Sequence, residues 1–287
     1  MTIKPLSNFY KISESELILQ ANDAYQLKAC LYRPVGIENT PAVVCVHGGA
    51  WVSGDRYAVS GLTDIIAQTG ITVLAIDTRL APRFRYPHAV IDVVFAIRWL
   101  KHHADEYGID AGRVGILGVS SGGFLGVMAT LNYDSPEFFQ EIDAVYQNTQ
   151  NGPAFIASCS GVLDPFARYE MARSQQNTEI MMCHDAFFNS IHEMEEASPF
   201  NVLSVYQGKN LPPAIFFQGE LDPRLPIDTA EKTAGYWNRA GGKAKAIVYP
   251  GAEHSVGTWS RKALIDMLTN FHALATEPSQ PGLFLVA

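Results

Sequence analysis

Continuous apolar runs alternate with stretches of helical spacing along most of the chain. Apolar runs without internal alternation are typical of strands buried on both faces of a parallel sheet. They lie at residues 42–46, 71–76, 113–118, 154–159, 214–217 and 245–249. Helical spacing is found at residues 58–68, 88–103, 124–131 and 259–274. This alternation predicts an α/β fold, with a mostly parallel central sheet and helices on both faces.

Three regions depart from the alternation. Residues 14–20 and 26–33 alternate roughly between polar and apolar side chains, which predicts two antiparallel strands. Residues 132–153 are polar and longer than a usual connection. Residues 165–200 are rich in Met and Phe and helical in composition, and they lie between two core strands. We expect this insertion to form a small helical cap on a single domain that spans residues 1–287.

Composition narrows the function classes. The chain has 287 residues, 47% of them hydrophobic and 17% charged, as in an ordinary soluble enzyme. The net charge of -8 argues against nucleic acids and anionic membranes as partners. No apolar run approaches the roughly 20 residues of a membrane span. The start of the chain shows no apolar signal-peptide core, so we expect a cytoplasmic protein.

The cysteines and histidines show no spacing typical of a metal site. Cys30, Cys45 and Cys159 lie in apolar runs and are interpreted as buried free thiols. A second group, Cys183-His184-Asp185 with His192, lacks a ligand pair with zinc-like spacing. We therefore expect that group to lie on the surface of the cap, and we expect no metal.

The sequence Gly118-Val119-Ser120-Ser121-Gly122 follows a predicted strand and precedes a predicted helix. This G-x-S-x-G pattern is typical of a sharp turn that exposes a serine nucleophile. Glycines two residues before and two after the serine relieve crowding in the turn. If Ser121 were the nucleophile, Val119 would occupy a position that needs a small residue. The register therefore indicates Ser120.

A serine nucleophile needs a histidine base, and the base needs a carboxylate that orients it. In this architecture the acid follows the serine in the chain and the histidine comes last. Asp222 follows the predicted strand 214–217, and His254 follows the predicted strand 245–249. Asp164 also follows a strand and is the main rival acid, whereas Asp228 is expected to begin a helix through a capping box.

The sequence His47-Gly48-Gly49-Ala50-Trp51 follows another buried strand. Acyl transfer places negative charge on the carbonyl oxygen of the substrate, and backbone N–H groups in an oxyanion hole can stabilise it. We assign this role to the N–H groups of Gly49 and Ala50, with Gly48 as a further candidate. The N–H of Ser121, the residue after the nucleophile, completes the hole.

These motifs together resemble the hormone-sensitive-lipase-like family of α/β-hydrolase carboxylesterases. The resemblance runs from about residue 42 to 275 and also includes Asp77-Thr78-Arg79-Leu80-Ala81-Pro82 and Tyr86-Pro87. It implies an α/β-hydrolase fold with a cap and no cofactor. The chain departs from the family pattern at four positions, which are Ala50, Thr78, Val119 and Ser121. Because Trp51 follows Ala50, the chain is also similar to acetylxylan/feruloyl esterases and kynurenine formamidases.

The motifs predict a serine carboxylesterase that acts on a small ester through an acyl-enzyme. An amidase or formamidase could use the same triad, and no sequence feature separates the two. A non-catalytic ligand-binding protein is the third alternative, but Ser120, Asp222 and His254 are all present. We expect Trp51 and Phe124 to contact the substrate and narrow the space beside Ser120, which favours short acyl chains. The sequence leaves open whether the chain forms a homodimer.

Overall fold

The computed structural model describes residues 9–22, 24–139, 142–147, 149, 151–206 and 211–277. Within these residues, eight strands form one sheet in the order β1-β2-β4-β3-β5-β6-β7-β8. Their bounds are β1 Ile12–Ala21, β2 Gln26–Pro34, β3 Thr40–Val46, β4 Thr72–Ile76, β5 Ile109–Val119, β6 Ile156–Cys159, β7 Ala214–Gly219 and β8 Ala244–Tyr249. β1 pairs antiparallel with β2 and β2 with β4, and all other pairs are parallel.

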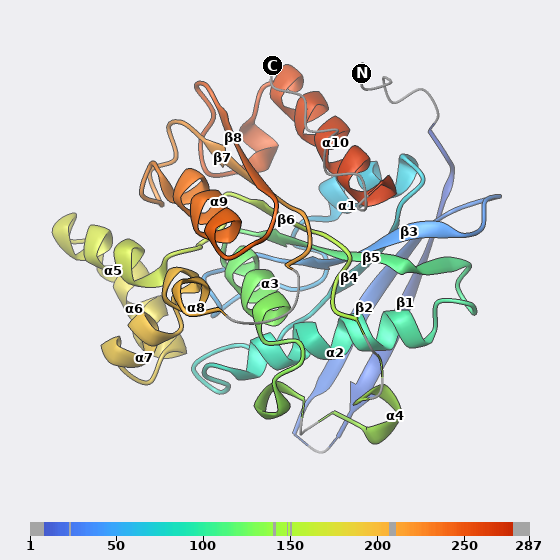
Figure 1. Cartoon of the computed structure of the whole chain (residues 1–287), viewed down its shortest axis with the longest axis horizontal. Coiled ribbons are helices and arrows are strands. Elements are labelled where there is room, and N and C mark those ends of the chain that lie inside the picture. The colour runs from blue at the N-terminus through green and yellow to red at the C-terminus, as the bar shows by residue number, and fades with distance from the viewer. Residues whose placement is uncertain are drawn as a thin grey trace.

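Helices cover both faces of this sheet. The described helices are α1 Ser60–Gln68, α2 His88–His102, α3 Ser121–Leu131, α4 Ala144–Gln147, α5 Pro165–Ser174, α6 Thr178–Phe187, α7 Ile191–Glu196, α8 Pro199–Ser204, α9 Thr229–Arg239 and α10 Arg261–Thr276, with short 3-10 turns η1 Pro136–Phe138 and η2 Val256–Thr258. Figure 1 shows α1 and α10 on one face, and α2, α3 and α9 on the other. The predicted fold class is therefore confirmed.

The strand side chains divide between two cores, as the period of two in a strand requires. In β3, Val43 and Cys45 pack in the core beneath α1 and α10, whereas Val44 and Val46 pack in the core that includes α2 and α3. All four side chains are almost fully buried. Because both faces are covered, the strand sequence shows no alternation, and burial of each such side chain contributes roughly 1.5–3 kcal/mol.

Polar residues extend some elements beyond the apolar pattern. β5 begins at Ile109, four residues before the predicted strand, because Ile109 pairs with Thr40. Asp110 and Arg113 within this extension form an ion pair of 2.7 Å. The capping box expected at Asp228 is wrong: α9 begins there, but no side-chain cap bond forms, and the carboxylate pairs with Lys232 at 2.8 Å instead.

The described parts of the connection 132–153 are held against the body of the molecule by two basic residues of α2, Arg98 and Lys101. Lys101 donates to the carbonyl oxygens of Asn151 and Gly152, each at 2.8 Å. Arg98 of α2 donates to the carbonyl oxygens of Tyr133 at 2.7 Å and Gln147 at 2.8 Å. Its guanidinium also lies over the ring of Tyr133. The long polar connection is thus anchored through its backbone, which the apolar pattern cannot reveal.

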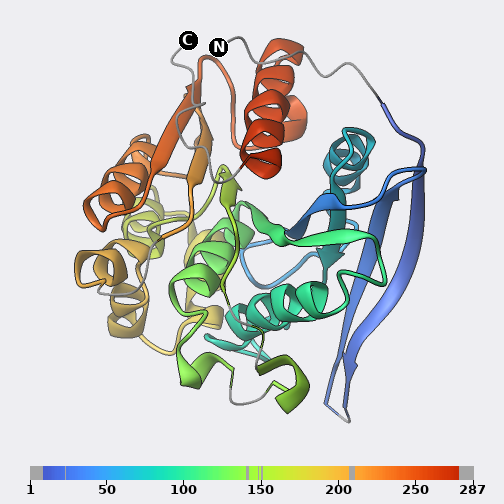
Figure 2. The same ribbon diagram turned by 45° about the vertical axis from the view of Figure 1, so that its right-hand side comes forward.

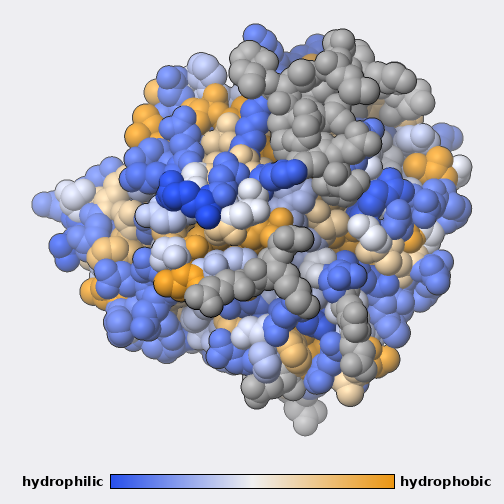
Figure 3. Space-filling model, viewed as in Figure 1, coloured by the Kyte–Doolittle hydropathy of each residue, from blue (hydrophilic) through white to orange (hydrophobic). Residues whose placement is uncertain are grey.

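The helices α5 to α8 lie between β6 and β7 in the chain and pack at one end of the molecule (Figures 1 and 2). α8 contacts α3 and α9, where the rings of Phe200 and Tyr236 stack at 4.9 Å. Figure 3 shows mainly polar residues on the outer surface of this end, with apolar residues in small groups. Among the described helices, none has both the length and the apolar character that crossing a membrane requires.

Candidate active site

The G-x-S-x-G sequence forms a tight turn between β5 and α3. Ser120 has φ 53° and ψ -120°, a conformation that L-residues rarely adopt. The glycines on both sides are required by space. A Cβ at Gly118 would overlap the backbone of Gly122, and a Cβ at Gly122 would overlap the carbonyl oxygen of Val46. Ser120 itself is fixed by hydrogen bonds from its N–H to Cys159 and from the N–H of Val162 to its carbonyl oxygen.

The structure brings together the three residues that the sequence predicts as a triad. Ser120 Oγ lies 2.9 Å from His254 Nε2. His254 Nδ1 lies 2.8 Å from Asp222 Oδ2, and the Asp222 side chain is fully buried. The three residues follow β5, β8 and β7, so they meet at the carboxyl end of the parallel strands, where open α/β sheets form their sites.

The rival acid, Asp164, has a different role. Its carboxylate accepts a hydrogen bond of 3.0 Å from the N–H of Ala167 and caps the N-terminus of α5. Burial raises the pKa of this carboxyl. No hydrogen bond joins Asp164 to His254 in the described part of the chain.

The loop after β3 lies beside Ser120. Gly49, Ala50 and Trp51 all have positive φ, at 117°, 51° and 65°. Gly48 packs so closely on Ser120 that an added Cβ would lie 3.0 Å from the serine Cβ. Within the described residues, the N–H groups of Gly49, Ala50 and Ser121 donate to no other protein group. These donors remain available to an oxygen atom of a bound molecule.

Trp51 and Phe124 are in a different environment from the one that the sequence suggested. Both are buried in an aromatic cluster, where Trp51 stacks on Phe187 of α6 at 4.7 Å and meets Phe124 edge-on at 5.6 Å. The indole N–H of Trp51 donates to the carbonyl oxygen of Ser121 at 3.2 Å. Neither residue lines the cavity beside Ser120. We therefore revise their role from substrate contact to support of the loop after β3.

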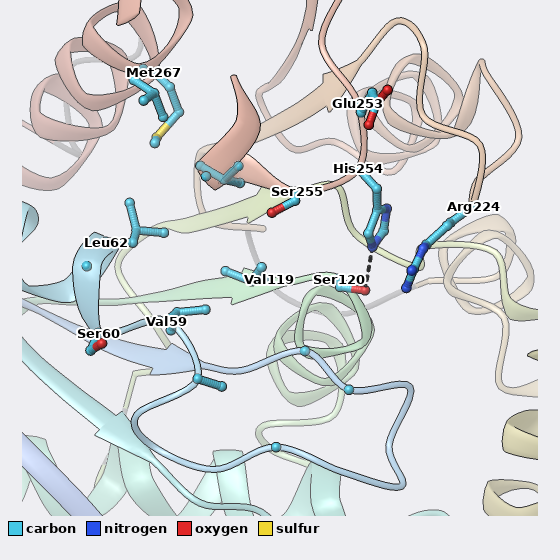
Figure 4. Close-up of a pocket in the computed structure, with 18 of the residues that line it drawn as sticks. Val59, Ser60, Leu62, Val119, Ser120, Arg224, Glu253, His254, Ser255 and Met267 are labelled. Carbon is cyan, nitrogen blue, oxygen red and sulfur yellow. Dashed lines mark hydrogen bonds between the residues drawn. The ribbon is translucent and has the colours of Figure 1, made fainter. Parts of the chain in front are cut away.

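A cavity of about 960 Å³ opens beside Ser120 and His254, between α1 and the first turns of α10 (Figure 4). Its large apolar lining residues come from these two helices, the loops before them and the end of β5: Val59, Leu62, Ile65, Val119, Val256, Leu264, Met267 and Leu268. Serines at positions 53, 60 and 255 add hydroxyl groups. The volume lies at the upper end of the range for small-molecule sites.

Two arginines at this site were not predicted from the sequence. Arg224 lines the cavity two residues after Asp222, and its N–H donates to Asp222 Oδ1 at 2.8 Å. Arg168 of α5 is 98% buried, and its Nε donates to the carbonyl oxygen of Arg224 at 3.2 Å. Burial lowers the pKa of Arg168 to about 10. Arg224 directly follows Asp222-Pro223, so its place near the site could have been predicted from the sequence. No feature of the sequence indicates that Arg168 lies near the site.

The Cys183, His184, Asp185 and His192 group does not form a site. His184 is fully buried against Trp51, so its expected position on the cap surface is wrong, and the side chain of His192 is exposed. Among the described residues, no group of His, Cys, Asp and Glu could hold a metal ion. Burial raises the pKa of the Cys45 thiol to about 12, which agrees with its interpretation as a buried thiol.

The sequence of this chain matches the model of a known protein family. The family model BD-FAE matches residues 31–235, well over half of the chain. The chain belongs to the BD-FAE family. The match includes the loop after β3, the turn at Ser120 and Asp222, and it supports the resemblance to hormone-sensitive-lipase-like esterases.

Individual relatives of this BD-FAE chain are esterases by name. It is 28% identical to Esterase LipC of Mycobacterium tuberculosis over 200 residues, which cover 66% of this chain and 46% of LipC. It is 36% identical to an arylesterase of Saccharolobus solfataricus over 102 residues, which cover 35% of this chain and 33% of the relative. The chain thus spans a third to a half of the length of these curated relatives.

The solved structures confirm the α/β-hydrolase fold. The hyperthermophilic esterase of the archaeon Pyrobaculum calidifontis superposes with a TM-score of 0.75 at 22% sequence identity. The superposition covers 94% of this chain and 87% of that esterase. At 22% identity, this likeness shows the fold alone.

Proposed function

We propose that this protein is a serine carboxylesterase that hydrolyses small esters, with a preference for short acyl chains. The observation that carries the proposal is the relay from Asp222 through His254 to Ser120, with hydrogen bonds of 2.8 and 2.9 Å. A serine in a tight turn beside a cavity, a base within hydrogen-bond reach and a carboxylate behind that base are the parts that acyl transfer needs.

The chemistry follows from the positions of these groups. Ser120 Oγ attacks the ester carbonyl carbon while its proton passes to His254 Nε2, and Asp222 stabilises the resulting imidazolium. The N–H groups of Gly49, Ala50 and Ser121 stabilise the negative oxygen of the tetrahedral intermediate. His254 then protonates the leaving alkoxide. A water molecule, deprotonated by His254, then attacks the carbonyl carbon of the acyl-enzyme. The bond from that carbon to Ser120 Oγ breaks, His254 returns the proton to Oγ, and the acid is released.

The relatives support an ester as the substrate. The curated names include an esterase, an arylesterase and an ethyl acetate hydrolase of Pseudomonas putida, the last 35% identical over 151 residues. These names share the carboxylic ester bond and differ in the rest of the molecule. They support the reaction class for this chain and leave the natural ester to experiment.

The proposal extends to the organisation of the chain. We propose that the segment at about 165–200 acts as a cap within a single domain, because its helix α6 contributes Phe187 to the cluster that supports the loop after β3. A homodimer and a cytoplasmic location stay predictions. Light scattering of the purified protein and fractionation of the source cells would test them.

Labelling with a fluorophosphonate tests the nucleophile. The wild type should react covalently and hydrolyse 4-nitrophenyl acetate, whereas Ser120→Ala should do neither. Ser121→Ala is the matched control, because it removes the neighbouring hydroxyl and keeps the backbone N–H. If the label persists in Ser120→Ala, or disappears only in Ser121→Ala, the assignment is wrong. Matched ester and amide substrates then compare the esterase with an amidase on the same triad.

A further inference from the structure

Arg224 is the cation closest in sequence to the proposed triad, and it lines the same cavity as Ser120 and His254. Figure 4 shows its side chain extending from the loop after β7, past His254, toward the space beside Ser120. The rest of the cavity lining is apolar or carries hydroxyl groups, apart from Glu253. In Figure 4 the side chain of Glu253 extends away from Ser120.

The backbone of Arg224 is fixed while its guanidinium is exposed. Its N–H donates to Asp222 Oδ1, and its carbonyl oxygen accepts from the buried guanidinium of Arg168. Both contacts use the backbone, so they fix where the side chain begins, and none of the described residues accepts a hydrogen bond from its five guanidinium N–H donors. Asp222 accepts from the Arg224 backbone N–H through Oδ1 and is hydrogen-bonded to His254 through Oδ2, and it forms no ion pair with the Arg224 guanidinium.

The positive charge at this position has no counter-ion in the described part of the chain. No Asp or Glu carboxylate there lies within ion-pair distance of the Arg224 guanidinium. This is notable in a protein with a net charge of -8, where acidic side chains outnumber basic ones. An arginine stays charged at all physiological pH values, and its planar fork fits a carboxylate through two parallel hydrogen bonds.

We propose that Arg224 is a specificity-determining residue that binds a carboxylate carried by the ester substrate. This inference rests on the proposed esterase function. The preferred substrates are then anionic esters, such as half-esters of dicarboxylic acids or esters of hydroxy acids. The apolar walls formed by α1 and α10 hold the hydrocarbon part, and the guanidinium selects for the negative charge of the carboxylate near the scissile bond.

Matched pairs of esters test the proposal. On the acyl side, 4-nitrophenyl hydrogen glutarate is compared with neutral 4-nitrophenyl pentanoate, and on the alcohol side, 3-carboxyphenyl acetate with phenyl acetate. The measured quantity is the ratio of kcat/KM for the anionic ester to kcat/KM for its neutral partner. In the wild type this ratio should exceed one in at least one pair and fall as salt is added.

Substitutions identify the residue responsible. Arg224→Gln should lower the ratio about tenfold, since hydrogen bonds to charged groups contribute more than neutral ones. Arg224→Lys keeps the charge without the fork and should give an intermediate ratio. Arg239→Gln is the control, because it changes the net charge equally on α9, where the guanidinium lies over the ring of Tyr236. It should leave the ratio unchanged.

Two results would overturn the inference: a ratio of one or less in both pairs, or a ratio that Arg224→Gln and Arg239→Gln lower equally. If the wild type hydrolyses no ester at all, the proposed function fails instead. The inference is then decided by calorimetry with monomethyl glutarate in the Ser120→Ala background. Binding there should weaken about tenfold on adding Arg224→Gln, and equal binding with and without Arg224 would reject it.

Discussion

Ser120 has a backbone conformation that costs on the order of 1–3 kcal/mol, and its neighbours determine whether that conformation persists. The glycines at 118 and 122 are part of this support, because side chains there would overlap backbone atoms that cannot move aside. The crowding expected in such a turn already explains, from the sequence alone, why both positions are glycine. The structure adds the atoms that they avoid.

A first prediction concerns Gly122. The change Gly122→Ala should lower the free energy of unfolding by about 2 kcal/mol or more, because a Cβ would overlap the carbonyl oxygen of Val46. Gly235→Ala is the control. It lies in α9 with only the end of the Arg239 side chain nearby, and it should raise stability by about 0.5–1 kcal/mol. Urea denaturation measures both. Equal effects would contradict this account of the turn.

A second prediction separates the two candidate acids. Asp222→Asn should lower kcat on the order of 10⁴-fold, because an amide favours the wrong tautomer of the base. Asp164→Asn should change kcat by less than about tenfold, since this side chain caps α5 and an asparagine can also cap a helix. Steady-state kinetics on one soluble ester compares them. A larger loss in Asp164→Asn would transfer the role of the acid.

At the scale of elements, α6 connects the cap to the loop after β3 through buried aromatic rings. Phe187 and His184 of α6 both contact Trp51, and Trp51 donates to Ser121 at the start of α3. His184 donates through Nδ1 to the carbonyl oxygen of Ile180, while its Nε2 is buried and has no hydrogen-bond partner among the described residues. Protonating this ring would place a charge in an apolar cluster.

A third prediction follows for pH. Burial lowers the pKa of His184 from 6.5 to about 4, so in this range the unfolded chain binds a proton that the folded chain does not. The stability of the folded state should therefore fall as pH drops from about 6.5 to 4, by up to about 3 kcal/mol from this group.

Two substitutions test whether His184 causes this dependence of the free energy of unfolding on pH. His184→Phe should flatten it in this range, while His192→Gln, at an exposed position, should leave it unchanged. Chemical denaturation at several pH values measures the slope. An unchanged slope in His184→Phe would assign the acid sensitivity to other buried groups, such as His47, whose pKa is also lowered by burial.

The elements differ in how far the sequence predicts them. β3 and β4 are buried on both faces, so apolar runs alone reveal them. The start of β5 contains the polar residues Asp110 and Arg113, and it is a strand because Ile109 pairs with Thr40. The pattern of apolar residues gives no sign of that pairing. The burial of Trp51 could not be predicted for the same reason. Its place after the glycine loop is visible in the sequence, but its burial depends on Phe187, which lies more than a hundred residues away.

In the candidate site, too, the sequence predicts some features and not others. Ser120, Asp222 and His254 could be predicted because each follows a recognisable strand, and strand ends converge in a parallel sheet. The cavity could not be predicted in this way. Its walls come from the outer helices α1 and α10, whose apolar residues at Leu62 and Met267 read equally well as core. Only their arrangement in space shows which of them face open volume.

On the scale of the whole molecule, we expect the cavity beside Ser120 to limit the length of the acyl chain that the proposed esterase accepts. A fourth prediction is that kcat/KM on 4-nitrophenyl esters peaks between acetyl and about hexanoyl, since each buried methylene contributes roughly 0.8 kcal/mol until the chain meets a wall. The walls are those of the α1 and α10 cavity, because Trp51 and Phe124 are buried elsewhere. Leu62→Trp should move the maximum to shorter chains. A maximum at ten or twelve carbons would reject the preference.

The order of the strands in the sheet also affects how the protein is made. Beyond β5, the strands β6, β7 and β8 add outward in the order in which they leave the ribosome. His254 follows Ser120 by 134 residues, and at about 5–20 residues per second this distance takes on the order of ten seconds to synthesise. During that interval β7 can already pair with β6, but Ser120 has no histidine beside it. If His254 is the base that we propose, the nascent chain gains esterase activity only when its last strand joins the sheet.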